Sequence, residues 1–311
     1  MSLQEAEQAL AMILSHQVEP VQLGAFLMLM RVKEETSEEL AGFVRAARAS
    51  LMLPSGLAPV DLDWACYAGK RRQLPWFLLS ALLLASHGVA VLMHGVRGGS
   101  TGRVYVPQAL KALGIEVAES CADAAEKIGS RRFAFVPLDV LNAELQHLLN
   151  LRSVLGLRSP VHTIVRMLNP FSAPASIMGI FHPGYDETHQ QAGALLQDQH
   201  LAVFKGEGGE AERNPDTACK VKMLHLGIMT EEEWPAIFPS RHLKDEAMDV
   251  SRLAALWRGE TEDEYGAASV VGTAAIVLRA LGRAHSMADA EIDAMHLWDA
   301  RDRAYLDSIQ G

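Results

Sequence analysis

The residues best suited to chemistry lie in one glycine-rich stretch, 93–102 (MHGVRGGSTG). It carries His94, Arg97, Ser100 and Thr101, and it follows an apolar run that is typical of a buried strand. Glycines let the backbone approach an anion closely, and the N–H groups of such a turn can bind a phosphate together with Arg97. The stretch therefore predicts an anion-binding turn at the end of a strand.

Composition sets the class of protein. The chain has 311 residues, 49% of them hydrophobic, and can bury one large domain or a large domain with a smaller partner. The formal net charge of −10 is the wrong sign for a generally basic nucleic-acid binder. Basic residues nevertheless gather between Lys70 and Arg166, so the overall charge does not exclude a local basic groove. Three widely spaced cysteines predict neither disulfides nor a zinc site, and we expect a cytoplasmic protein.

One apolar run raises the question of a membrane segment. Residues 76–93 contain no Asp, Glu, Lys or Arg. Pro75 and Gly88 stand where a helix would begin and end. We therefore interpret the run as a buried helix followed by a buried strand, and we expect no membrane partner.

Two kinds of pattern divide the chain. Residues 1–60 predict short helices, with Thr36 and Glu39 forming a capping box. From residue 61 short apolar strands alternate with helices through residue 311, which predicts an α/β domain whose mostly parallel sheet is flanked by helices. The predicted strands are 64–67, 89–92, 133–136, 177–181, 202–204 and 220–224. The predicted helices include 76–87, 138–149, 189–197 and two more in 267–309.

Several motifs in matching order resemble glycosyl transferase family 3, the anthranilate and nucleoside phosphoribosyltransferases. His94-Gly95-Val96-Arg97 resembles the family's Lys-His-Gly-Asn-Arg, and 152–159 (RSVLGLRS) resembles Arg-Arg-Glu-Leu-Gly-Ile-Arg-Thr. Residues 168–170 (LNP) and 178–183 (MGIFHP) resemble two further elements. The resemblance implies a small N-terminal helical domain, a large α/β domain, and a helical segment near 160–175 packed on the N-terminal domain. It also implies a homodimer formed through the N-terminal domain, where residues 25–30 (AFLMLM) are unusually apolar.

The family's catalytic equipment is altered. Its Gly-Thr-Gly-Gly-Asp phosphate loop is replaced by 66–70 (CYAGK), and its Asn-x-Ser-Thr helix start by 75–78 (PWFL). Its adjacent Asp-Glu pair, which holds magnesium, is replaced by Glu210 and Glu212, which could bind a cation but which we expect to be solvated. We therefore predict no catalytic residues and no cofactor. Magnesium enters only under the alternative that the chain is a divergent glycosyl or phosphoribosyl transferase.

Cations now stand where the substrate loop would be. This pattern is similar to the nucleic-acid-binding, YbiB-type branch of the family, which implies a non-enzymatic homodimer that binds DNA and RNA with little sequence preference. Tyr67, Trp76 and Tyr105 could stack on bases, although core packing is the better interpretation of Trp76. Each cation could instead belong to a solvated turn or an ion pair, and His94 could be structural. The predicted phosphate-binding residues are Lys70, Arg71, Arg72, His94, Arg97, Arg103, Arg152 and Arg158.

Overall fold

The N-terminal part of the chain is a small helical domain. The computed structural model describes residues 1–182 and 184–310, so Pro183 of the MGIFHP motif and the final Gly311 lie outside the described residues. Helices α1 (Leu3–Leu14), α2 (Pro20–Lys33) and α3 (Ser37–Ala49) form the domain. The Thr36 hydroxyl accepts from the Glu39 N–H and the Glu39 carboxylate accepts from the Thr36 N–H, which confirms the predicted capping box.

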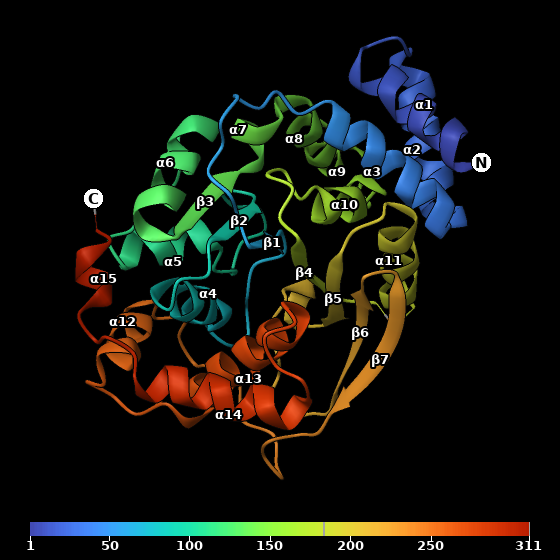
Figure 1. Ribbon diagram of the computed structural model, residues 1–311. Coiled ribbons are helices and arrows are strands. Elements are labelled where there is room, and N and C mark those ends of the chain that lie inside the picture. Colours follow the sequence, from blue (N-terminus) through green and yellow to red (C-terminus); the bar gives the residue numbers. More distant parts are fainter. Residues whose placement is uncertain (183, 311) are drawn as a thin grey trace.

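The remainder is built on a seven-stranded sheet in the order β3-β2-β1-β4-β5-β6-β7 (Figure 1). Strands β1 to β5 run parallel to one another, whereas β6 is antiparallel to β5 and β7 is antiparallel to β6. The sequence did not predict β7, because its exposed run of Thr and Glu lacks the apolar alternation of a half-buried strand. The strands are β1 (Leu62–Cys66), β2 (Val91–Gly95), β3 (Phe133–Pro137), β4 (Ala175–Ile180), β5 (His200–Lys205), β6 (Cys219–His225) and β7 (Ile228–Trp234).

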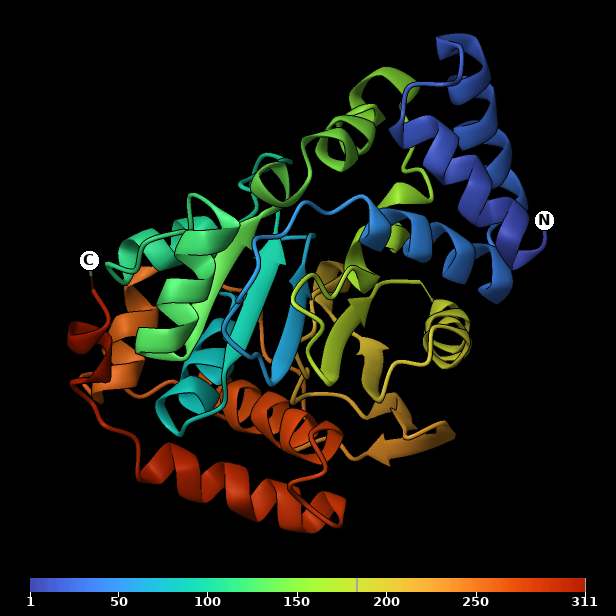
Figure 2. The same cartoon turned by 45° about the horizontal axis from the view of Figure 1, so that its top comes forward.

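Both faces of the sheet are covered by helices. Successive strand residues point to opposite faces, so Trp64 joins one hydrophobic cluster and the neighbouring Ala65 joins another. Helices α4 (Phe77–Ser86) and α13 (Glu264–Ala280) cover the first face, with α14 (Met287–Asp299) outside them (Figure 1). Helix α11 (Tyr185–Leu195) covers the second face and lies beside the helical domain (Figure 2).

Shorter helices complete the fold, and some of them join the two domains. The Arg48 guanidinium of α3 donates to the Met167 carbonyl at 2.8 Å and pairs with Asp198 at 2.8 Å. Residues 161–167 share a hydrophobic cluster with α1 and α3. The remaining helices are α5 (Val106–Ala112), α6 (Cys121–Arg131), α7 (Leu138–Leu141), α8 (Ala143–Asn150), α9 (Arg152–Leu155), α10 (Val161–Ile164), η1 (Val165–Met167), η2 (Glu207–Gly209), α12 (Ser251–Arg258) and α15 (Tyr305–Ser308).

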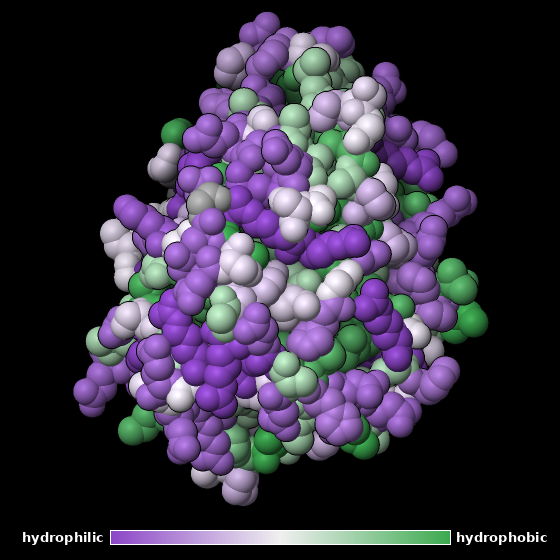
Figure 3. All heavy atoms as spheres, turned by 60° about the vertical axis from the view of Figure 1, so that its left-hand side comes forward, coloured by the Kyte–Doolittle hydropathy of each residue, from purple (hydrophilic) through white to green (hydrophobic). Residues whose placement is uncertain are grey.

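The apolar run 76–93 forms α4 and then β2, as the sequence predicted. Among the described residues, no helix is both long enough and apolar enough to cross a membrane. Hydrophilic residues cover most of the face drawn in Figure 3, and hydrophobic residues form separate patches between them.

The topology creates a natural ligand site at the end of the sheet where the parallel strands have their carboxyl ends. Strand β1 has β2 on one side and β4 on the other, so the strand order reverses between β1 and β4. Ligands of open α/β sheets bind in the crevice outside the carboxyl ends of the strands at such a reversal. The loops that follow β1, β2, β4 and β5 meet there, and an antiparallel bridge between Lys70 and Val104 joins the first two.

Candidate nucleic-acid interface

A long basic groove lies at this end of the sheet. The space between its walls measures about 2440 Å³, open solvent included. Nine Lys and Arg side chains line it against four carboxylates, in a chain whose formal net charge is −10. The cations are Arg71, Arg72, Arg103, Arg152, Arg158, Lys205, Lys220, Arg241 and Lys244, and the carboxylates are Asp186, Glu207, Asp216 and Glu233.

The arginines at the centre of the groove repel one another. Burial together with Arg166, Arg152 and Arg103 lowers the pKa of Arg158 to about 10. Arg103 donates to the carbonyls of Ala68 and Gly69 at 3.0 and 2.8 Å, which fixes its guanidinium without neutralising it. A like-charge group of this kind is stabilised by an incoming anion.

Arg71 and Arg72 stand at one wall of the groove with exposed side chains. Their backbone N–H groups both donate to Glu207 Oε1, at 3.1 and 2.9 Å. This carboxylate holds the loop after β1 through its backbone. The two guanidinium groups remain exposed at the groove.

Lys70 corrects one prediction, because its side chain is 1% exposed and cannot contact a strand in the groove. Its ammonium lies 3.0 Å from Glu207 Oε2 and also donates to Glu212, which in turn accepts from the Phe77 N–H at 2.8 Å. Burial acts to lower the pKa of Lys70, but the two carboxylates outweigh it and raise that pKa. Lys70 is therefore an internal counter-ion.

The two acidic residues expected in solvent are buried instead. Glu210 is 1% exposed and accepts from the N–H groups of Ala68 and Gly69 at 2.7 and 2.5 Å. Burial raises the pKa of both Glu210 and Glu212. The Glu210 carboxylate thus occupies the backbone donors of the loop after β1, where the family resemblance places the phosphate loop.

A magnesium site does not fit this arrangement. Magnesium needs oxygen ligands that are free to complete an octahedron with water and substrate. Here Glu210 Oε1 accepts from two backbone N–H groups, its Oε2 is buried away from water, and Glu212 is committed to Lys70. Within residues 1–182 and 184–310, no group of three or more His, Cys, Asp or Glu side chains is placed to hold a metal ion.

His94 and Arg97 also depart from the prediction. His94 is fully buried, with Nδ1 2.7 Å from the Tyr67 hydroxyl and Nε2 3.2 Å from Asp63 Oδ1. It is a structural histidine, the alternative interpretation of the sequence. Arg97 is exposed and pairs with Asp139 at 3.0 Å, and it is not among the residues that line the groove.

The predicted stacking residues are interior. Tyr67, Trp76 and Tyr105 are all buried, and core packing of Trp76 is confirmed. The aromatic side chains that line the groove are instead His242, Tyr265, Phe181 and His182. Of these, Phe181 and His182 directly follow β4 and are exposed. Phe181 and His182 lie at the end of the predicted strand 177–181 and within the motif 178–183, and these two signals could have found them.

The groove contains four cations absent from the predicted set. Lys205 ends β5 and Lys220 lies on β6, so strand prediction places both near the sheet edge. Arg241 and Lys244 belong to an irregular segment between β7 and α12. Only the tertiary fold brings that segment to the groove.

Comparison with known proteins explains this architecture. Residues 1–51 match the helical bundle domain of a glycosyl transferase family, and residues 77–299 match its α/β domain. The chain belongs to glycosyl transferase family 3. An uncharacterized protein of Aquifex aeolicus is 30% identical over 81% of this chain and 79% of its own length. An anthranilate phosphoribosyltransferase of Moorella thermoacetica is 29% identical over 72% of this chain and 66% of its own length.

Solved structures of the family share the fold. Anthranilate phosphoribosyltransferase from Thermus thermophilus superposes with a TM-score of 0.84 at 22% identity, covering 99% of this chain and 94% of that enzyme. The enzyme from Saccharomyces cerevisiae in complex with PRPP and Mg gives a TM-score of 0.81 at 15% identity, over 99% of this chain and 92% of that one. At these identities the likeness establishes the fold of this family 3 protein.

Proposed function

We propose that this family 3 protein binds single-stranded DNA or RNA along the basic groove, mainly through phosphate contacts. The observation that carries the proposal is the group of arginines in the groove, where burial and the neighbouring arginines lower the pKa of Arg158. Lys and Arg contacts to phosphates supply most sequence-independent affinity for nucleic acids. The acidic remainder of the chain would repel a strand from other faces and confine it to the groove.

The loop after β1 supports binding without transfer. Glu210 occupies the Ala68 and Gly69 N–H groups, and Lys70 is neutralised by Glu207 and Glu212. A sugar pyrophosphate would have to displace a buried carboxylate from these donors. The exposed Arg71 and Arg72 beside them stay available to a polyanion that runs past the loop.

The test is a titration with labelled oligothymidylate at several salt concentrations. The logarithm of the association constant should fall with the logarithm of salt by about 0.7 per phosphate neutralised. Replacing Arg71 and Arg72 together with Ala should weaken binding and make this slope shallower by about one to two units. Arg97→Ala is the matched control, because that arginine is exposed but lies outside the groove lining.

Two results would refute this function. A double variant with unchanged affinity and slope would mean that Arg71 and Arg72 belong to a solvated turn. An Arg97→Ala variant that weakens binding as much as the double variant would mean that charge anywhere on the protein suffices. Unchanged secondary structure by circular dichroism shows that the variants are folded.

A second candidate function is phosphoribosyl transfer, and the comparisons favour it. Seven of the curated relatives that match this chain are anthranilate phosphoribosyltransferases, including that of Moorella thermoacetica. The assay is consumption of phosphoribosyl pyrophosphate with anthranilate and magnesium. Turnover at about 1 per second or faster, typical of enzymes, would replace the binding proposal with this one.

A homodimer formed through the helical domain is part of the proposal. The apolar side chains of Val21, Leu29 and Val32 on α2 are 80%, 70% and 81% exposed. Exposed apolar residues gathered on one element mark an interaction surface. A dimer would carry two grooves, and a long strand that reached both would bind with added avidity.

A further inference from the structure

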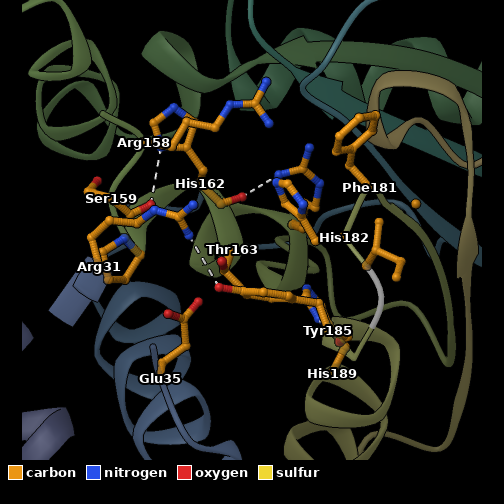
Figure 4. Close-up of a pocket in the computed structure, with 14 residues that line it drawn as sticks. Arg31, Glu35, Arg158, Ser159, His162, Thr163, Phe181, His182, Tyr185 and His189 are labelled. Carbon is orange, nitrogen blue, oxygen red and sulfur yellow. Dashed lines mark hydrogen bonds between the residues drawn. The ribbon is translucent and has the colours of Figure 1, made fainter. Parts of the chain in front are cut away.

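A side pocket opens from the groove between the two domains. It lies among α2, the segment 158–166 and α11 (Figure 4). Its space is about 560 Å³, open mouth included. Arg158, Phe181 and His182 line both this pocket and the groove, so a strand in the groove passes its mouth.

Two hydrogen-bond acceptors of the pocket are unused. Glu35 is 8% exposed, and its Oε1 atom is buried with no hydrogen-bond partner among residues 1–182 and 184–310. Its carboxylate lies beside Arg31 and Tyr185 at the pocket (Figure 4). The Nε2 atom of His189, a residue 2% exposed, is equally without a partner in this part of the chain. A buried acceptor left unpaired costs stability, so a ligand that donates a hydrogen bond to it would be favoured.

The protonation of His189 follows from its neighbour. Its Nδ1 faces the Tyr185 carbonyl, which can only accept, so Nδ1 carries the hydrogen and Nε2 accepts. Burial lowers the pKa of His189 to about 4, and the ring is neutral at pH 7. Glu35 and His189 are therefore both acceptors, and they favour a ligand that carries N–H donors.

The pocket also holds donors and aromatic surfaces. Arg31 donates to the Tyr185 hydroxyl at 3.3 Å and keeps further guanidinium N–H groups, and Arg158 stands at the junction with the groove. The rings of Phe181 and His182 pack edge to face with centroids 4.9 Å apart at the mouth. Such rings offer a platform on which a base can stack.

We propose that this pocket takes one unstacked nucleobase of the bound strand and prefers guanine, a proposal that rests on nucleic-acid binding in the groove. Guanine presents N1–H and N2–H₂ side by side, which suit the Glu35 carboxylate, and its O6 and N7 accept from arginine. Adenine would turn its N1 acceptor toward Glu35 and leave the carboxylate unpaired. A simple anion would pair with Arg31 or Arg158, but it has no donor for the Glu35 carboxylate and would be repelled by it.

The experiment compares oligothymidylates of about 12 nucleotides, a length within the site size of single-strand binders, that differ at one central position. That position carries guanine, adenine or hypoxanthine, and hypoxanthine lacks only the 2-amino group of guanine. The guanine strand should bind about tenfold more tightly than the adenine strand, with hypoxanthine between them. Glu35→Gln should remove the preference among the three strands. The exposed neighbour variant Glu34→Gln should leave it intact.

The possible failures are distinct. Equal affinities for the three substituted strands, with oligothymidylate still bound, would overturn the guanine pocket and leave the groove function standing. No binding of any strand would overturn both. The comparison among strands uses the unmodified protein, so it decides the question even if Glu35→Gln fails to fold.

Discussion

Replacing Lys70 with Met tests the interior of the site most directly. The change removes the ammonium that lies between Glu207 and Glu212. Glu207 keeps two backbone N–H donors and a side chain 20% exposed, so it can relax toward water. Glu212 is 1% exposed and keeps only the Phe77 N–H, so one buried carboxylate is stranded.

The cost can be worked out from the pKa of that carboxyl. The variant escapes a buried charge by protonating Glu212, whose ordinary pKa is 4.5. Each pH unit above that value costs about 1.4 kcal/mol, so protonation costs about 3 kcal/mol at pH 7 and about 1 kcal/mol at pH 5. The loss of stability should therefore be about 3–5 kcal/mol at pH 7, the range for breaking a buried ion pair, and it should shrink on acidification. The loss grows with pH because the pKa of Glu212 is raised in the folded variant. At low pH the carboxyl is protonated in both the folded and the unfolded state, whereas at higher pH ionisation favours the unfolded state.

Urea unfolding at pH 5, 6 and 7 measures this loss. Lys205→Met is the matched control, because that lysine is exposed and should change stability by less than about 0.5 kcal/mol. The double variant Lys70→Met/Glu212→Leu should recover much of the stability, since it strands no charge. A loss for Lys70→Met of under about 1 kcal/mol that does not vary with pH would refute the buried pairing.

Three further outcomes follow from other parts of the molecule. Burial acts to raise the pKa of Glu39, but hydrogen bonds from Lys33, the N-terminal ammonium and the Thr36 N–H lower it to about 2. The stabilisation by Glu39 is therefore present above pH 4.5 and is lost as the pH falls toward 2. Glu39→Gln should flatten this acid dependence of the unfolding free energy, and an unchanged profile would argue against these pairs. A Cβ on Gly206 would lie 1.7 Å from the Glu210 carbonyl oxygen. Gly206→Ala should therefore lower the free energy of unfolding, measured with urea, by about 1–3 kcal/mol. An unchanged free energy would mean that the loop moves to admit the methyl group. Leu29→Asp/Val32→Asp should convert a dimer to a monomer in light scattering, whereas Ile292→Asp on α14 should not; a monomeric unmodified protein would end the dimer proposal.

The sequence predicted the framework of this protein well, because local pattern carries that information. The capping box at Thr36 and Glu39 and six of the seven strands follow from spacing and apolar runs alone. The order of motifs was enough for the family and hence for the fold. The exposed arginines beside the loop after β1 were also readable, since a cationic run after a strand lies near the sheet edge.

The tertiary structure decided which charges are available. Lys70 and Arg71 are neighbours in sequence, yet one is buried between carboxylates and the other lies exposed at the groove. The difference arises because Lys70 bridges Val104 and meets Glu212, a residue 142 positions away. Glu210 reaches the Ala68 N–H across the same separation. Burial and charge pairing depend on contacts between segments that are distant along the chain, so residue type and spacing do not specify them.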